Sequence, residues 1–498
     1  MSFRNFIRYS LIVLLLLAAS RGFGQTTAPS RAWNYVLLEG SELTDDCLIC
    51  GRPTISAPMR GSFRLRLLEV NPLFARYAVE DLKFFAGSAG GLQYRVTGSG
   101  TYQFGGEVAL QQEMALQVVI DDGYTARPAS FDSGLVFVSR PWPMIAITLP
   151  QTDGTPTRTY TLQVNAAPLR EIWFSTLTGF HAGVAPQTSN YISPGDLISS
   201  AGRVVKRNHE LTARLGVMPS VPDLGLDAVD ILPGGEIIFS IEYDIFSETL
   251  GPLHHGDILS AKGRIVRSYA SLIGAFSPQP PVADQGLDAV QLVRATELAT
   301  AKEFLFSIEQ DFFSESLGRT IRRGDLLSSL GQVAKTNAEL LARFSPTDAQ
   351  QDYGLDAVYV WPSGEIWFST EKGFTGPNFA AYGPGDLLSD QGYVVYRNLE
   401  LVGPFQPIED ASSFGLDALF VITDATPRPP TGRFTAVERA NLSVRLSWEG
   451  EGRVFQINRA SQLPGSWLPV SPIMPDQSFT DPEAIYQQSQ GFYQLQQW

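Results

Sequence analysis

Hydrophobic and polar residues alternate along much of the chain. The pattern is clear in "SFRLRLLEV" (62–70), "MALQVVIDD" (114–122) and "VRLSWEG" (444–450), where every second residue is apolar. Successive side chains of a strand point to opposite faces, so this alternation predicts strands with one buried face. Clusters of Gly, Pro and Ser separate these stretches, as turns do. The pattern predicts an all-β protein, with short helical turns in segments such as "NAELLARF" (337–344).

The middle of the chain contains four copies of one pattern. Each copy has a Glu-hydrophobic-x-Phe-Ser segment, then Gly-Asp-Leu or Gly-Asp-Ile, and closes with Gly-Leu-Asp-Ala. An internal repeat of this kind predicts a solenoid, a propeller or an array. The first segment occupies 171–175, 236–240, 303–307 and 365–369, the second 195–199, 256–260, 324–328 and 385–389, and the third 225–229, 286–290, 354–358 and 415–419.

Each copy predicts two hairpins, hence four strands, which is the size of a propeller blade. In the last copy the turns fall at 362–364 and 391–392. The repeat region begins with a Glu-Phe-Ser strand that has no Leu-Asp-Ala strand before it. It ends with a Leu-Asp-Ala strand that has no Glu-Phe-Ser strand after it. An open solenoid would leave both edges unpaired, whereas a ring would join them. We therefore expect a four-bladed β-propeller closed by its last strand.

The run Asp-Ala, several residues, then Gly-Glu-hydrophobic-x-Phe resembles the start of a hemopexin-type repeat. The resemblance covers 171–425 in outline and implies a four-bladed propeller. The chain departs from that family in its longer blades and in lacking the aromatic-Trp-Arg signature of the third strand. It also lacks a Cys pair that would join the first and last blades. The sequence of the repeats is also similar to that of repeats in large exported proteins of environmental bacteria.

The last module resembles another family. Its Trp-containing strand at 444–450 and its late strand "GFYQLQQW" (491–498) resemble a fibronectin type III-like sandwich. The resemblance implies an appended adhesion or spacer unit.

The amino terminus has the order of a secretory signal. Arg4 and Arg8 precede the apolar run "LIVLLLLAA", and small residues follow. The run is too short to span a bilayer comfortably, so we expect cleavage and a secreted or otherwise extracytoplasmic protein in the periplasm, at the cell surface or in the medium. The predicted domains are a signal peptide (1–24), an N-terminal β-sandwich or barrel (25–168), the propeller (169–424), a Pro-rich linker (425–432) and the fibronectin type III-like module (433–498).

Charge and motifs narrow the function. The net charge of −14 over 498 residues argues against nucleic acid and anionic lipid as partners. The chain contains no nucleophile elbow, phosphate loop or His-Glu-x-x-His motif. We expect a non-catalytic exported protein that binds a carbohydrate or protein ligand at the cell surface. The alternatives are a structural spacer and a secreted carbohydrate-active hydrolase, in which Glu242/Asp244 or Glu309/Asp311 would form the carboxylate pair.

Cys47 and Cys50 are the only cysteines. In an oxidising compartment a close pair favours a disulfide. Free thiols and a zinc knuckle are the alternatives, but a knuckle needs four ligands and no second Cys pair exists.

The aspartates of the Gly-Leu-Asp-Ala segments have two interpretations. As structural residues they would accept backbone N–H bonds where strands begin. If these strands are innermost, four carboxylates would instead surround an axial channel and could hold a structural calcium ion there. The aspartates of the Gly-Asp segments, in contrast, look like turn residues. The candidate metal ligands are Asp227, Asp288, Asp356 and Asp417.

Two long loops are rich in Gly, Pro, Asn and aromatic residues. They span 178–195 and 372–385, in the first and last copies, which become neighbours if the ring closes. Such loops on a rigid scaffold are typical of recognition surfaces, although the aromatics could equally pack their own loops. The candidate ligand-binding residues are Phe180, Asn190, Tyr191, Asn378, Phe379 and Tyr382.

Overall fold

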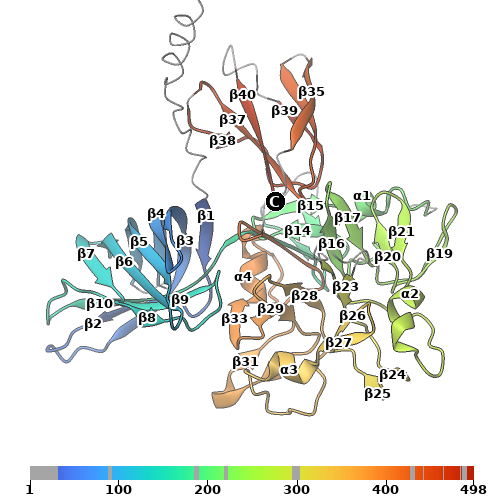
Figure 1. Cartoon of the computed structure of the whole chain (residues 1–498), viewed down its shortest axis with the longest axis horizontal. Coiled ribbons are helices and arrows are strands. Elements are labelled where there is room, and N and C mark those ends of the chain that lie inside the picture. The colour runs from blue at the N-terminus through green and yellow to red at the C-terminus, as the bar shows by residue number, and fades with distance from the viewer. Residues whose placement is uncertain are drawn as a thin grey trace, which may run out of the picture.

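The computed structural model shows an all-β protein with a ten-stranded sheet, four four-stranded sheets and a small C-terminal module (Figure 1). It describes residues 32–498 except 88–91, 184–189, 218–222, 294–302, 427–431, 441, 464, 483 and 485–490. The predicted signal peptide and most of the predicted linker lie outside these residues. Among the described residues, no helix has the length and apolarity needed to cross a membrane.

The N-terminal module is one hydrogen-bonded sheet of ten strands. Its buried face holds large side chains such as Phe63, Phe84 and Leu116. The predicted alternation is confirmed in β6, where every second residue from Gln112 to Ile120 is buried. The strands are β1 (Ala32–Leu37), β2 (Glu42–Asp46), β3 (Ile55–Val70), β4 (Phe74–Ala86), β5 (Tyr94–Gly105), β6 (Gln111–Asp121), β7 (Ala126–Asp132), β8 (Val136–Phe137), β9 (Ile145–Pro150) and β10 (Thr159–Ala167).

The repeat region folds into four sheets of four antiparallel strands, as the two-hairpin pattern predicts. From the first strand outward, the first sheet is β34 (Leu419–Thr423), β11 (Leu169–Phe174), β14 (Leu197–Ser199) and β15 (Arg203–Lys206). The second is β16 (Val229–Leu232), β17 (Glu236–Phe239), β20 (Ile258–Ser260) and β21 (Arg264–Arg267). The third is β22 (Val290–Val293), β23 (Glu303–Phe306), β26 (Leu326–Ser328) and β27 (Gln332–Lys335). The fourth is β28 (Ala357–Val360), β29 (Ile366–Ser369), β32 (Leu387–Ser389) and β33 (Tyr393–Tyr396).

Each copy also carries a short two-stranded hairpin and a single turn of α-helix. The hairpin follows the second strand of its sheet, and the helix follows the fourth. The hairpins are β12 (Phe180–His181) with β13 (Tyr191–Ile192), β18 (Ile245–Ser247) with β19 (Gly251–Leu253), β24 (Phe312–Ser314) with β25 (Arg319–Ile321), and β30 (Phe374–Thr375) with β31 (Ala381–Tyr382). The helices are α1 (Asn208–Thr212), α2 (Tyr269–Ile273), α3 (Asn337–Leu341) and α4 (Asn398–Val402), with 3-10 turns η1 (Gly274–Phe276), η2 (Pro377–Phe379) and η3 (Gly403–Phe405).

The first and last segments of the repeat region pair with each other. Strand β34 lies antiparallel to β11, with Phe420 opposite Trp173. The first strands of the four sheets also contact one another in turn: β16 contacts β34 and β22, and β28 contacts β22 and β34. The end of the region thus supplies the strand that the first sheet lacks.

One hydrogen bond recurs between consecutive sheets. The Ser of each Phe-Ser pair donates its hydroxyl to the carbonyl of the Leu in the next Gly-Leu-Asp-Ala segment, and the fourth bond joins the fourth sheet to β34 of the first. These bonds run from Ser175 to Leu226 (2.6 Å), Ser240 to Leu287 (2.9 Å), Ser307 to Leu355 (2.8 Å) and Ser369 to Leu416 (2.8 Å). Since each hydroxyl is buried, the bond accounts for the Ser of the motif.

The C-terminal module consists of two three-stranded sheets around a core that includes Trp448, Phe455 and Ile457. Its strands include those predicted at 444–450 and 491–498. The sheets are β35 (Arg433–Ala440), β36 (Ser443–Glu449) and β39 (Ser478–Asp481), and β38 (Leu468–Pro469), β37 (Phe455–Ala460) and β40 (Phe492–Gln497).

Both flanking modules dock on the repeat region. The indole N–H of Trp498, the last residue, donates to Asp424 at 2.9 Å, and Arg453 forms an ion pair with Asp230 at 2.9 Å. On the other flank, Met144 packs in one core with Trp361. The modules therefore share cores and buried ion pairs with the repeats instead of hanging on free linkers.

Cys47 and Cys50 form a disulfide, as predicted. Their loop follows β2, and Leu48 and Ile49 within it are exposed. A disulfide that closes so short a loop restricts the unfolded chain little, and the chain-entropy relation gives about 2 kcal/mol. We expect the purified protein to have a mass two hydrogens below that of its reduced form and to lose only a few degrees of melting temperature on reduction. Stoichiometric zinc on the purified protein would contradict this assignment.

Candidate metal centre

The Gly-Leu-Asp-Ala segments place their four aspartates at the same end of β34, β16, β22 and β28. Each segment begins with a glycine in the left-handed region, such as Gly225 at φ 75° and Gly354 at φ 74°. A Cβ on Gly354 would also lie 2.4 Å from the carboxyl carbon of Glu371, so both conformation and space require glycine here. The tight turn brings the aspartate that follows toward its counterparts from the other sheets.

Three glutamates join the four aspartates. They stand two residues after the Phe-Ser pair in the second, third and fourth copies, where the sequence has Ser-x-Glu. The first copy has Leu177 at this position, against Gly415. None of these glutamates was predicted as a metal ligand, although the Ser-x-Glu pattern that three of the copies share was an available signal. They are Glu242, Glu309 and Glu371.

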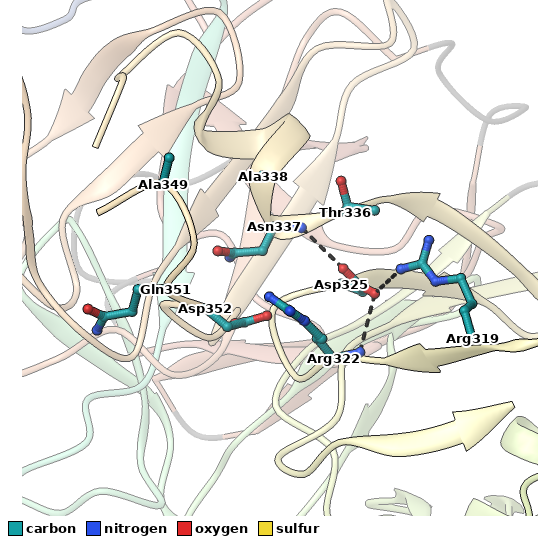
Figure 2. A pocket seen from close by; sticks show the side chains of 9 residues that line it. All are labelled: Arg319, Arg322, Asp325, Thr336, Asn337, Ala338, Ala349, Gln351 and Asp352. Carbon is teal, nitrogen blue, oxygen red and sulfur yellow. Dashed lines mark hydrogen bonds and ion pairs between the residues drawn. The ribbon is translucent and has the colours of Figure 1, made fainter. Parts of the chain in front are cut away.

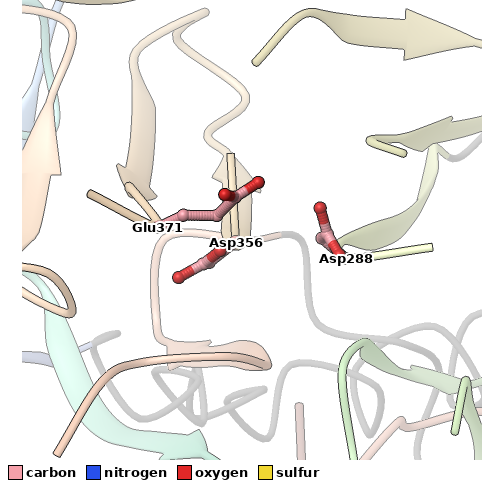
Figure 3. Close-up of side chains that lie close together, drawn as sticks. All are labelled: Asp288, Asp356 and Glu371. Carbon is pink, nitrogen blue, oxygen red and sulfur yellow. The ribbon is translucent and has the colours of Figure 1, made fainter. Parts of the chain in front are cut away.

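The closest group is Asp288, Asp356 and Glu371. Each offers one carboxylate oxygen, and these oxygens lie within 4.8 Å of one another (Figure 3). Figure 3 shows the three side chains near one another, on separate segments of the chain. Such spacing suits a cation that is coordinated by several oxygens at 2.3–2.6 Å each, the range for calcium.

Two carboxylate oxygens of this cluster are buried without a partner. Oδ2 of Asp227 and Oδ2 of Asp288 have no hydrogen-bond donor among the described residues. The Asp227 side chain is only 7% exposed, so water does not replace the missing donor readily. Leaving a buried carboxylate oxygen unsatisfied costs free energy that a bound cation or a proton would offset.

Positive charge within reach of the cluster is limited. Arg323 forms an ion pair with Glu371 at 2.7 Å. Burial raises the pKa of Glu309, and the nearby His255 lowers it by a smaller amount. These groups do not balance seven carboxylates, so the cluster favours a cation.

Burial and mutual repulsion raise the pKa of every aspartate in the cluster. Burial is the largest cause for each, and the negative charge of neighbouring carboxylates adds to it. For Asp417, burial together with Glu242 and Glu309 raises the pKa to about 7. Two like charges in a dry site cannot both ionise without cost.

This gives a pH dependence for the metal-free protein. Since the folded-state pKa of Asp417 is raised above the unfolded value, the folded state holds its proton more tightly, and stability decreases as pH rises from about 4 to about 7. In excess chelator we expect a lower melting temperature at pH 8 than at pH 5, and a smaller difference in Asp417→Asn. An unchanged difference in that variant would show that the dependence arises elsewhere.

The aspartates of the Gly-Asp segments have the predicted turn role. Asp325 accepts backbone N–H bonds from Asn337 (3.2 Å) and Arg322 (3.3 Å) and an ion pair from Arg319 (2.8 Å). These residues line a small pocket of about 200 Å³ at α3 (Figure 2). With its donors in place, the Asp325 carboxylate stabilises the turn and offers no free ligand set.

Of the six predicted ligand-binding residues, two are buried or half-buried and four lie at the surface. Phe180 is fully buried against Phe405 and Phe414, so it is a core residue and not a recognition residue. Tyr382 is half-buried and stacks on Phe374 with ring centroids 4.7 Å apart.

The other four predicted residues lie at the surface. Asn190 and Tyr191 are exposed, and Phe379 is 92% exposed beside Asn378, both with left-handed φ. The first loop docks on the segment after α4, where Gly183 donates to the Phe405 carbonyl. A ligand role for these four remains a prediction.

The hydrolase alternative finds little geometric support. Asp244 accepts hydrogen bonds from the rings of His254 (3.0 Å) and His255 (2.6 Å). Although burial alone would raise it, these bonds lower the pKa of Asp244 to about 2. Glu242 instead acts on the repeat aspartates, where its charge adds to the burial that raises the pKa of Asp227 and Asp417.

Comparisons with known proteins assign no family. No family model and no curated protein matches the chain. One structurally similar solved structure is the extracellular domain of a hybrid two-component system protein from B. thetaiotaomicron. It is 9% identical, with a TM-score of 0.19 over 85% of this chain and 74% of that chain.

Proposed function

We propose that the protein is an exported, non-catalytic binding protein whose repeats form a closed four-bladed β-propeller with a calcium site at one end of its axis. The observation that carries the proposal is the close group of Asp288, Asp356 and Glu371, together with the buried, unpartnered oxygens of Asp227 and Asp288. The predicted signal peptide and the Cys47–Cys50 disulfide support an extracytoplasmic location.

Closure is supported by the pairing of β34 with β11 and by the four Ser-to-Leu hydrogen bonds, the last of which runs from Ser369 to Leu416. In a ring each sheet contributes the same two acidic positions to the axis, apart from Leu177 in the first copy. The site therefore arises from the repetition of the same acidic positions around the ring. The carboxylates that are close enough to share one cation are those of Asp288, Asp356 and Glu371.

Calcium fits the donor set better than other metals. The ligand atoms are carboxylate oxygens alone, and hard cations prefer such donors. Zinc sites in proteins usually contain nitrogen or sulfur ligands, and the cluster of Asp288, Asp356 and Glu371 contains neither. Magnesium demands nearly ideal octahedral geometry, whereas calcium tolerates the irregular arrangement that Asp288 of the third sheet and Asp356 and Glu371 of the fourth provide.

Isothermal titration of chelator-treated protein with calcium tests the proposal. We expect one saturable site with a dissociation constant of about 10⁻⁴ M or lower, and at least tenfold weaker binding in Glu371→Gln. The exposed Glu315→Gln variant is the matched control and should bind as the parent does. Absence of binding, or equal weakening by both variants, would contradict the proposal.

A further inference from the structure

A second site lies between the N-terminal module and the fourth sheet. A cleft of about 480 Å³ separates the β9–β10 strands from the β32–β33 turn. Clefts of this size between domains are common places for small-molecule ligands. The lining residues used below are Arg140, Thr148, Gln163, Asn165, Gln391 and Tyr393.

The walls offer neutral hydrogen-bonding groups. Thr148 and Gln163 are directly opposite each other on β9 and β10, and both are exposed. Neither side chain makes a hydrogen bond to another described residue. Gln391 stands on the facing turn and uses its amide N–H on Asp390, which leaves its amide oxygen for a ligand.

The floor is a buried polar network. Arg140 is 8% exposed and forms an ion pair with Glu365 at 3.4 Å. Its guanidinium donates to Asn165 and Tyr393 and lies 3.8 Å from the centre of the Tyr393 ring. Tyr393 in turn donates to Glu365.

This network fixes the orientation of two cleft residues. A buried ion pair contributes little to stability on balance, so its effect here is to hold the Asn165 and Tyr393 side chains in place. The charge of Arg140 is neutralised by Glu365, and no other charged side chain lines the cleft. A ligand would therefore meet amides, hydroxyls and apolar side chains, but no uncompensated charge.

We propose that this cleft binds a neutral, polyhydroxylated ligand, a short stretch of glycan. Primary amides donate and accept at once, so Gln163 and Gln391 can each bond adjacent sugar hydroxyls from opposite walls. Val136 lines the same cleft, is only partly buried and supplies an apolar contact of the kind that the C–H faces of a sugar ring require. The cleft is built from residues outside the metal centre, so binding does not depend on calcium.

The test uses the mature full-length protein and calorimetric titration with a panel of neutral trisaccharides, namely cellotriose, xylotriose, maltotriose, laminaritriose and triacetylchitotriose, in chelator. We expect at least one to bind, and Gln163→Ala and Gln391→Ala each to weaken its binding about tenfold. Gln332→Ala is the matched control, because Gln332 occupies on β27 the position of Tyr393 on β33.

Several distinct outcomes would overturn the proposal that the cleft binds a glycan. Failure of every probe to bind, or binding that neither glutamine variant weakens, would overturn the cleft assignment. Binding that appears only when calcium is restored would also overturn it and would place the ligand at the metal centre. Should Gln391→Ala lower the melting temperature, the more exposed Gln163 decides the outcome.

Discussion

Replacing Phe420 by proline in the middle of β34 is expected to lower the melting temperature of the whole repeat region by about 10 °C or more. Proline lacks the backbone N–H and fixes φ, so it removes a ladder hydrogen bond and breaks the pairing of β34 with β11, and a shift of this size corresponds to a loss of about 3 kcal/mol or more. In a ring this strand holds the first sheet to the fourth, and its loss exposes edges on both.

Phe420→Leu is the matched control. It keeps the backbone N–H and most of the apolar volume of a side chain that is 3% exposed, so we expect a cost near 1 kcal/mol. Differential scanning calorimetry distinguishes the outcomes. If the proline variant showed a separate early transition for the first sheet while the other three melted at the parental temperature, the repeats would be an open stack.

Calcium is expected to raise the melting temperature of the chelated protein by about 5–10 °C. A ligand at a hundred times its dissociation constant stabilises the folded state by about 2.7 kcal/mol, which corresponds to a shift of this size in a domain of 150–250 residues. Asp356→Asn should abolish the calcium effect, because Asp356 belongs to the closest ligand group.

The same variant should not destabilise the chelated protein. Burial, Asp417 and Glu371 all raise the pKa of Asp356, so an uncharged amide at this position relieves repulsion. We expect its melting temperature in chelator to equal or exceed that of the parent. Asp410→Asn, in the exposed loop that precedes the last Gly-Leu-Asp-Ala segment, is the control and should retain the full calcium response. A calcium response in Asp356→Asn equal to that of the parent would refute the ligand assignment.

The strands of the repeats could be predicted because local patterns set them. The alternation, the turn glycines and the unmatched first and last strands all lie in short stretches, and the pairing of β34 with β11 follows from them. The buried Ser was also visible as an invariant of the four copies within this one chain, although its partner carbonyl in the next sheet was not.

The carboxylate cluster of the candidate metal centre could be predicted only in part. Its aspartates were predicted as candidates because a carboxylate recurs at the start of each first strand, but Glu371 was not predicted and Glu242 was assigned to another pair. A contact between residues of different sheets depends on how the sheets face one another, and sequence spacing does not encode that arrangement.

Phe180 illustrates an error that the repeats themselves could have prevented. Its loop composition suggested recognition, yet the equivalent hairpin positions in the other copies are Ile245, Phe312 and Phe374. A position that is apolar in all four copies indicates a core contact. The docking of Trp498 on Asp424 had no comparable signal, since a terminal tryptophan does not indicate which surface it meets.

The central claim is that carboxylates from the four sheets hold a cation on the axis of a closed ring. The most direct measurement is an anomalous difference map from crystals of the mature protein grown with calcium and then with manganese, which is a stronger anomalous scatterer at accessible wavelengths. We predict a peak within coordination distance of Asp288, Asp356 and Glu371, with β34 paired to β11 in the same map. A map with no peak among these carboxylates would contradict the metal assignment, whether the cation is bound elsewhere on the protein or is present only in the bulk solvent.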